Sequence, residues 1–216
     1  GEYDGAKNAI NGLTIARSTN TLNTGLFGRA QGATISKIGL TDVNITGNTW
    51  VGPLVGLAGT TSITNCYTSS GTVTGTSYVG GLVGYLFSSA SITNTYSNVD
   101  NVTASSNYIG GLVGRIYSST ILNSYSTGKV VSTNSRGGLV RNLYQSNNTI
   151  TDSFYDSDTS GQSDTGKGIG KTTSLMKTLA TFTDTSLADL TGSWDFYSTW
   201  EIDSSGTIND GYPYLK

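Results

Sequence analysis

One short apolar pentapeptide recurs through the first 155 residues of this chain. It reads GLFG, GPLVG, GGLVG, GGLVG and GGLVR, and its copies close at Gly28, Gly56, Gly84, Gly114 and Arg141. A second segment recurs in phase as ISKIG, ITNCY, ITNTY, ILNSY and ITDSF, beginning at Ile35, Ile63, Ile92, Ile121 and Ile150. Steps of 27 to 30 residues at this regularity indicate stacked units, each packed on its neighbours.

Each repeat holds three short strand-like segments, because a β-branched stretch such as TVTG or NVTA follows the first two. None of these segments is long enough to bury an apolar face alone. We therefore predict an all-β fold, a parallel β-helix (β-solenoid) of about five coils with three short strands each. In GGLVG we expect Leu and Val to be buried, and the glycines to turn the corner with backbone angles that other residues resist.

Stacking of the coils predicts ladders of like residues along the solenoid axis. The aliphatic ladder is Ile63, Ile92, Ile121 and Ile150. The aromatic ladder is Tyr67, Tyr96, Tyr125 and Phe154. The polar ladder, whose side chains we expect to bond coil to coil, is Asn65, Asn94, Asn123 and Asp152. With Ile63 and Tyr67 facing inward, strand alternation would point Cys66 outward, but the turn nearby interrupts the alternation and leaves its exposure open.

The last part of the chain departs from the repeat. We expect residues 1–155 to form the solenoid and residues 156–216 a small C-terminal cap packed on it, the two making one structural domain. Thr172 or Thr173 can begin a short helix in this cap that contains Leu175, Met176 and Leu179. The cap is rich in aromatic residues, and we expect it to cover the open end of the last coil.

Charge is sparse and unevenly distributed. Only 12% of the residues are charged and the net charge is −2, which argues against nucleic acid as a partner. Residues 1–151 carry eight Lys or Arg against four acidic residues, whereas residues 152–216 carry four against ten. The two parts of the chain therefore have opposite net charge.

Other absences narrow the classes of function. Cys66 is the only cysteine, so no disulfide can form within the chain. There is no histidine, which removes the commonest general base and metal ligand. No apolar run reaches membrane-spanning length and no signal peptide is present, so we expect no transmembrane segment.

The repeated segments resemble a known family. GPLVG, GGLVGY and GGLVGR, with ITNCY, ITNTY and ILNSY, are similar to the GLUG motif, a repeat of bacterial and some archaeal surface proteins. The opening GEYDGAKNAINGLTI resembles the stretch that introduces such arrays. FYDSDTSGQSDTG, KTTSLMKTLATF and GYPYL resemble the segment that closes them.

The resemblance implies an extracellular location, at the cell surface, in adhesins or in the non-catalytic parts of IgA-cleaving metalloproteases. Those proteases need an HExxH zinc site, and a chain without histidine cannot supply one. We therefore expect no enzyme activity and no catalytic residues. The expected role is a structural or adhesive module that binds glycans or other surface proteins.

One acidic segment has the spacing of a metal loop. Asp156, Asp158, Ser160 and Asp164 occupy calcium-ligand positions, but Lys167 stands where an EF-hand needs a bidentate Glu. These four residues are a candidate Ca²⁺ site, and an ordinary hydrogen-bonded turn is the alternative. We expect no other cofactor.

A basic group in the last two coils leaves an enzymatic alternative open. It consists of Arg115, Lys129, Arg136 and Arg141. Asp152 near Arg141 would then serve as a catalytic pair of a polysaccharide lyase or hydrolase. The simpler interpretation is a solvated charged face.

Two further expectations concern the surface. Asn44, Asn101 and Asn147 lie in N-x-[ST] sequons and are candidate glycosylation sites. Nothing before GLFG resembles a cap, so the first coil can offer its edge to another chain. A self-assembling filament with head-to-tail contacts between copies is therefore the alternative function.

Overall fold

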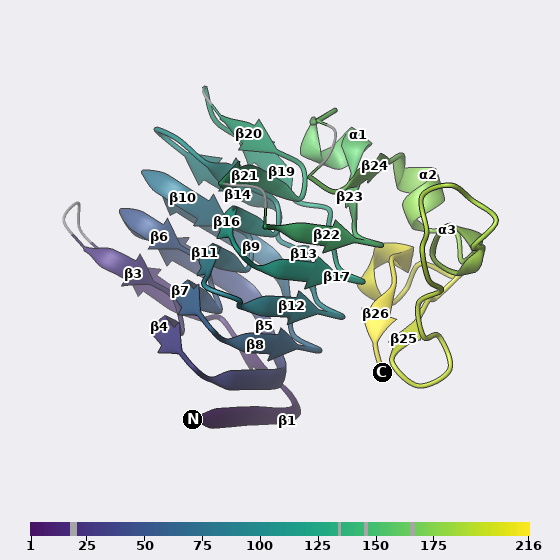
Figure 1. Cartoon of the computed structure of the whole chain (residues 1–216), viewed down its shortest axis with the longest axis horizontal. Coiled ribbons are helices and arrows are strands. Elements are labelled where there is room, and N and C mark those ends of the chain that lie inside the picture. Colours follow the sequence, from purple (N-terminus) through teal and green to yellow (C-terminus); the bar gives the residue numbers. More distant parts are fainter. Residues whose placement is uncertain (18–20, 134, 145–146, 165–166) are drawn as a thin grey trace.

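The chain winds into a parallel β-solenoid of about five coils, with the C-terminal segment lying along one flank (Figure 1). The computed structural model describes residues 1–17, 21–133, 135–144, 147–164 and 167–216. The coils stack in sequence order from the N-terminus, so each strand pairs in parallel with the same segment of the next coil.

Two five-stranded sheets contain the strands on either side of the GLVG turn. Before the turn lie β3 (Leu22–Thr24), β6 (Thr49–Val51), β10 (Ser77–Gly80), β15 (Ile109–Gly110) and β20 (Arg136–Gly137). After it lie β4 (Phe27–Gln31), β7 (Val55–Gly59), β11 (Val83–Phe87), β16 (Val113–Tyr117) and β21 (Val140–Tyr144).

The remaining solenoid strands join one 14-stranded sheet that bends around the other sides of the coil. In the first two coils these are β1 (Glu2–Asn11), β2 (Thr14–Ala16) and β5 (Thr34–Thr46). The next two coils supply β8 (Ser62–Thr64), β9 (Tyr67–Gly75), β12 (Ser91–Thr93), β13 (Tyr96–Asn98) and β14 (Asn101–Ala104). The last coils supply β17 (Thr120–Leu122), β18 (Tyr125–Ser126), β19 (Lys129–Val131), β22 (Thr149–Thr151) and β23 (Phe154–Asp156), and β24 (Ile169–Lys171) extends the sheet beyond them. Tight corners divide the later coils into short strands, whereas β5 and β9 each join two of the expected segments into one strand of 13 and 9 residues.

The interior is filled by rows of aliphatic side chains in register. Ile63 lies opposite Ile92, Ile92 opposite Ile121, and Ile121 opposite Ile150 in the parallel ladders. The first three of these side chains are fully buried and Ile150 is partly buried. Identical residues in adjacent coils fill the same volume, so each coil reproduces the packing of the previous one.

The glycines of GGLVG serve close packing rather than unusual backbone angles, which corrects the expectation. None of Gly80, Gly81 and Gly84 has a positive φ. A Cβ at Gly80 would lie 2.0 Å from the carbonyl oxygen of Val83, and one at Gly84 would lie 2.5 Å from the amide nitrogen of Val51. Backbone from neighbouring strands therefore occupies the space that a side chain would need.

Cys66 points inward, against the simple count of strand alternation. Cys66 is fully buried, because Asn65 before it takes the left-handed conformation at φ 53° and resets the strand alternation. Cys66 therefore occupies the inward position after the turn, and Tyr67 points outward. A positive φ recurs at Asn94 and Asn123, and asparagine tolerates this left-handed conformation well.

Cys66 belongs to a buried row of small polar side chains. The row is Cys66, Thr95, Ser124 and Ser153. Ser124 Oγ donates to the carbonyl of Leu122 at 2.8 Å and accepts from the Thr95 amide of the preceding coil at 3.3 Å. Thr95 and Ser153 repeat this pattern, and the Cys66 thiol donates to the carbonyl of Thr64. The row therefore satisfies the backbone groups that each turn leaves inside the solenoid.

The aromatic row faces outward, against the C-terminal segment, which corrects the expected inward orientation. The rings of Tyr67, Tyr96 and Tyr125 stack at 5.0 and 5.1 Å with an interplanar angle of 7°. Phe154 continues the row in register with Tyr125. These rings form a second apolar cluster with side chains of the C-terminal segment.

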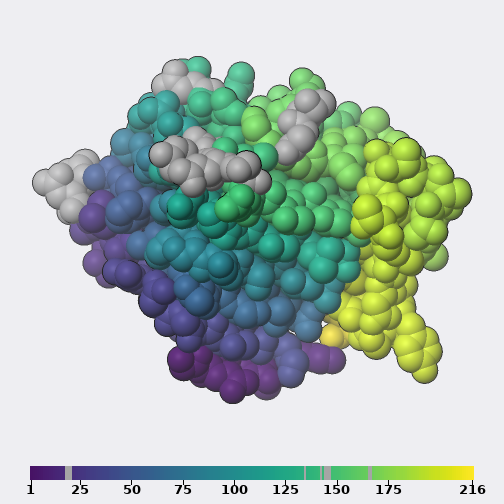
Figure 2. Space-filling view, viewed as in Figure 1, coloured from purple at the N-terminus to yellow at the C-terminus, as the bar shows by residue number. Residues whose placement is uncertain are grey.

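The C-terminal segment, residues 157–216, contains short elements joined by turns. They are α1 (Ser157–Ser160), α2 (Thr173–Met176), α3 (Ala180–Thr183), β25 (Trp200–Glu201), the 3-10 turn η1 (Asn209–Gly211) and β26 (Tyr214–Leu215). Thr172 caps α2 as expected, whereas Leu179 lies outside that helix and precedes α3. β24 extends the last coil, and α1 with Gln162 and Asp164 also contacts this end, whereas the later part of the segment covers the flank, as the yellow band in Figure 2 shows.

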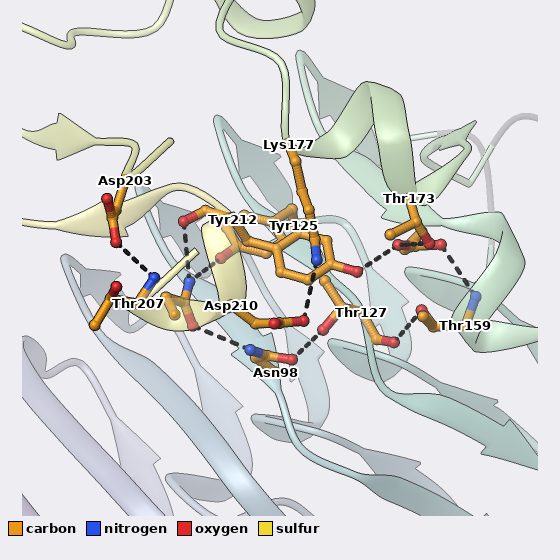
Figure 3. Close-up of polar contacts among 12 residues, drawn as sticks. Asn98, Tyr125, Thr127, Thr159, Thr173, Lys177, Asp203, Thr207, Asp210 and Tyr212 are labelled. Carbon is orange, nitrogen blue, oxygen red and sulfur yellow. Dashed lines mark hydrogen bonds and ion pairs between the residues drawn. The ribbon is translucent and has the colours of Figure 1, made fainter. Parts of the chain in front are cut away.

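Buried hydrogen bonds fasten this segment to the aromatic row. The Tyr125 hydroxyl donates to the carbonyl of Pro213 at 2.5 Å and accepts from the Asn209 amide at 2.8 Å. The Asn209 side-chain oxygen accepts from the Asn98 amide at 3.0 Å, and Asn98 accepts from Thr127 of the next coil (Figure 3). The flank is therefore joined by both ring packing and satisfied polar groups.

The Tyr125 hydroxyl provides a test of this joint. We predict that Tyr125→Phe lowers the free energy of unfolding by about 1–3 kcal/mol, because it removes two buried hydrogen bonds. Tyr125→Ala should cost about 3–5 kcal/mol through the cavity it creates. Urea unfolding measures both, with Tyr197→Phe as the control at a fully solvated ring. A Tyr125→Phe variant as stable as the control would contradict the assigned bonds.

The Cys66 thiol provides a test of the buried polar row. Burial raises the pKa of this thiol from 9.0 to about 12, so in the native state it stays protonated where an unfolded cysteine ionises. Its contribution to stability is complete below pH 9 and is lost as the pH rises towards 12. We predict that Cys66→Ser removes this part of the pH dependence while changing stability at pH 7 by less than about 1 kcal/mol. Rapid reaction of the native thiol with Ellman's reagent at pH 8 would contradict the burial.

Candidate functional site

A half-buried row of aromatic side chains crosses the coils on the side away from the C-terminal segment. It contains Trp50, Tyr78 and Tyr108, which occupy the same position of β6, β10 and the turn before β15. The rings of Tyr78 and Tyr108 stack at 5.0 Å, and those of Trp50 and Tyr78 lie 6.4 Å apart. The residue after each aromatic is fully buried in the core, so the row has a rigid foundation.

Arg115 of β16 adds a cation to this row. Its guanidinium carbon lies 5.0 Å from the ring centre of Tyr85 and 5.4 Å from that of Tyr78. One guanidinium nitrogen also donates to the Tyr78 hydroxyl at 3.4 Å. Each of these contacts is a cation–π or polar contact at a half-buried surface. We name Trp50, Tyr78, Tyr85, Tyr108 and Arg115 the aromatic strip.

The backbone of the strip is held in an unfavourable conformation. Trp50, Tyr78 and Tyr108 have φ of 56°, 55° and 62°, in the left-handed region that bulky side chains avoid. Each such residue costs on the order of 1–3 kcal/mol and persists only where its surroundings hold it in place. Asn23, at the equivalent position of the first coil, also has a positive φ, of 59°, so the fold imposes this conformation and the sequence places three bulky aromatic side chains in it.

The candidate calcium residues are engaged with one another and with the C-terminal segment. Asp156 is fully buried, caps α1 through the amides of Asp158 and Thr159, and accepts from the hydroxyl of Tyr212 at 2.6 Å. Asp158 accepts from the backbone amide of Thr173.

Ser160 and Asp164 are similarly engaged. Ser160 is buried, and its hydroxyl accepts from the amide of Gln162. Asp164 accepts from the amide of Gly138 at 2.8 Å. In the described part of the chain, no three acidic, cysteine or histidine side chains gather in a way that could hold a metal ion. These oxygens act as helix caps and turn acceptors.

The residues of the enzymatic alternative do not form one site. Asp152 is 5% exposed, and its carboxylate accepts from the amides of Thr191 and Gly192 and from the Thr191 hydroxyl. Arg115 belongs to the aromatic strip. Arg141 and Arg136 line a separate hollow beside Asp164, while Lys129 is exposed on β19. Asp152 is thus committed to anchoring the C-terminal segment rather than to Arg141.

Comparison with known proteins agrees with this architecture. The family model described as the GLUG motif matches residues 75–106 and 105–131. The chain contains GLUG-motif repeats. Both matches cover coils that contribute to the aromatic strip.

A curated relative shares part of the sequence. Over 96 residues the chain is 40% identical to a protein of Evansella cellulosilytica described as a "Putative Gly-rich membrane protein". The match covers 43% of this chain and 10% of that protein, so the chain spans about a tenth of the relative's length.

A solved structure shares the fold. It is described as a "putative immunoglobulin A1 protease" from Bacteroides ovatus, and it superposes with a TM-score of 0.65 over the whole of this chain and 77% of that one. At 16% identity the similarity concerns the fold alone.

The GLUG repeats contain a signal for the strip that our sequence analysis missed. An aromatic stands two residues before the first glycine of the motif in three successive repeats, at Trp50, Tyr78 and Tyr108. Comparison of the repeats column by column would have found it. The contacts of Tyr85 and Arg115 with this row could not have been found in this way, because both residues come from the neighbouring sheet.

The candidate ladders and sequons occupy different faces. The backbone amides of Asn65, Asn94 and Asn123 donate to carbonyls of the next coil, so the bonds of this row that join coils come from the backbone.

The candidate glycosylation sites Asn44 and Asn101 lie in one outer row on either side of Thr72. Asn44 and Asn147 are exposed and Asn101 is half-buried. No helix in the described residues is long and apolar enough to cross a membrane.

Proposed function

We propose that this chain is a non-catalytic adhesive module of an extracellular microbial surface protein, and that the aromatic strip binds a protein on another surface. The single observation that carries the proposal is the strained, half-buried row of Trp50, Tyr78 and Tyr108 with Arg115 among the rings. Trp, Tyr and Arg are the residues that dominate binding energy at protein interfaces.

The rest of the molecule supports a binding role. The strip lies on strands of a closely packed solenoid, so its rings do not have to be ordered when a partner arrives. GLUG repeats and the fold shared with the Bacteroides ovatus protein are compatible with a surface role, as is the description of the relative as a membrane protein. The committed hydrogen bonds of Asp152 and Asp156 favour a role without catalysis.

The test replaces three aromatic residues of the strip by asparagine, which should leave the solenoid folded. We predict that the triple variant Trp50→Asn, Tyr78→Asn and Tyr108→Asn weakens adhesion by roughly thirtyfold, the loss of about 2 kcal/mol typical of an interface hot spot. Asparagine accepts the left-handed conformation, so relief of strain offsets the lost stacking and stability should change little. Adhesion of the labelled chain to microbial cells measures the effect, with unfolding curves alongside.

Ser89→Asn is the matched control, because Ser89 also has a positive φ, at 60°, and is exposed. Protease treatment of the cells should abolish binding if the partner is a protein. Binding that survives protease but is lost after periodate would instead assign the strip to glycans. Unchanged adhesion of a folded triple variant would overturn the proposal.

A filament subunit is the second candidate, favoured by open strand edges at both ends. In the described residues β1, β3 and β4 pair on one side only, as do β21 and β22 at the opposite end. Such edges can accept another coil of the same polypeptide or another copy. From α2 onwards the acidic C-terminal segment lies along the flank rather than on an end, so most of its charge does not favour end-to-end contact.

The filament hypothesis predicts mass that grows with concentration. Head-to-tail stacking should give polymers in sedimentation velocity that lengthen as the chain is concentrated. Because the contact is a backbone ladder, high salt should not dissolve them. A monomer at all concentrations would exclude this candidate and leave the adhesive module.

A further inference from the structure

A pocket of about 260 Å³ lies between the first coils and the end of the C-terminal segment. Its walls include Lys7, Lys37, Gly39, Asn65 and Tyr67 of the solenoid, and Ser198 and Thr199 of the C-terminal segment. We name it the lysine pocket. Figure 1 shows the C-terminal end of the chain at the level of these first coils, far from the strands that contain the aromatic strip.

Two departures from the repeat coincide at this pocket. Gly39 is in register with Tyr67, so the aromatic row that continues through Tyr96 and Tyr125 has no ring in this coil. Lys37 takes the left-handed turn position that asparagine holds at Asn65, with the same φ of 53°. Where a repeat is otherwise regular, departures that converge on one cavity are expected at a functional site.

With no ring at position 39, Tyr67 packs over the glycine and still lines the pocket. A Cβ at position 39 would lie 2.2 Å from the Tyr67 ring, so that ring extends over Gly39. Tyr67 is half-buried and lines the pocket, with Tyr96 stacked on its other face. The electron-rich face of a tyrosine attracts polarised C–H groups, such as those on the face of a sugar ring.

An irregularity in β1 brings a second lysine to the pocket. The pairing of β1 with β5 shifts between Asp4 and Asn8, and Lys7 within that shift has a φ of 63°. Bulges of this kind re-aim a side chain. Lys37 forms an ion pair with Asp4 at 3.0 Å, whereas no ion pair involving Lys7 occurs among the described residues. The pocket therefore has an ammonium group available for an anion.

The other walls can accept hydrogen bonds. The hydroxyls of Ser198 and Thr199 donate to the carboxylate of Asp195, which leaves their lone pairs for incoming donors. The side-chain oxygen of Asn65 is buried without a partner in the described structure, and a hydroxyl entering the pocket would give it one. Acceptors beside an ammonium and a ring face suit a ligand that has hydroxyl groups, a carboxylate and a flat apolar face.

We propose that the lysine pocket binds a single acidic sugar unit, a pyranose ring with a carboxylate, at the end of a glycan. The carboxylate lies towards Lys7 and Lys37, one face of the ring packs on Tyr67, and its hydroxyls donate to Thr199 and Asn65. The volume is that of one ring rather than of a chain. The inference does not depend on the aromatic strip, which lies on the two five-stranded sheets.

D-Glucuronate is the first probe, with D-glucose and acetate as references, in an NMR titration that follows the backbone amides of the pocket. We expect glucuronate to bind about tenfold or more tightly than either reference, because only it combines ring and charge. Added salt should weaken the binding, since Lys7 is exposed.

Paired variants locate the site. Lys7→Gln should weaken glucuronate binding several-fold, and Asn65→Asp should weaken it further by adding a negative charge to the pocket that holds the ligand carboxylate. Asn94→Asp is the matched control, because it makes the same change at the same turn position one coil away, outside the pocket. The strip variants should bind glucuronate unchanged, which separates this inference from the adhesive proposal.

Three results would each overturn the inference in a folded protein. Equal affinity for glucose would show that the lysines do not recognise the ligand. Equal affinity for acetate would reduce the site to an anion contact. An Asn94→Asp effect as large as that of Asn65→Asp, or no binding of glucuronate at all, would remove the pocket as the site.

Discussion

The parallel hydrogen-bonded register between coils is the constraint on which the whole structure depends. Because every residue pairs with its equivalent one repeat later, a side chain that suits one coil must suit its copies above and below. Isoleucine fills the interior, small polar groups satisfy the turn, and glycine stands wherever two backbones meet. The repeat in the sequence is the direct expression of this geometry.

The left-handed turn residue decides which rows face the interior and which face outward. Its positive φ at Asn65 turns the chain so that Cys66 enters the core and Tyr67 leaves it. The tyrosine row thereby becomes a surface on which the C-terminal segment can pack. Where the row ends at Gly39, the same geometry leaves a pocket instead. The surface that the C-terminal segment covers and the lysine pocket thus both arise from one row of the solenoid.

Much of the fold followed from the sequence, because spacing and stacking are linked. Ile63, Ile92 and Ile121 lie opposite one another as their spacing requires. The orientation of Tyr67 could not be obtained by alternation, since a single left-handed residue reverses it. The reason for the glycines also required the structure, because the atoms that exclude a Cβ belong to other coils.

The candidate sites were less predictable than the fold. The aromatic strip joins residues from two sheets, and Arg115 is distant in sequence from Tyr78, which it contacts. The lysine pocket depends on residues 198 and 199, whose position on the flank has no counterpart in the repeat. The four candidate calcium residues illustrate the converse case. Their spacing suits a metal loop, yet the cap of α1 and the Tyr212 hydroxyl take up the carboxylate of Asp156.

The C-terminal segment runs lengthwise across coils that otherwise contact only their neighbours. It bonds to Asp152 near one end, to Tyr125 and Asn98 further along, and borders Gly39 in the first coils. A bare solenoid pulled from its ends can peel one coil at a time, as a zipper opens. A segment that is bonded to several coils, as the C-terminal segment is, distributes the same force over many contacts. If the chain serves at a cell surface, as we propose, we expect this arrangement to make the solenoid yield as one unit rather than unfold from its end.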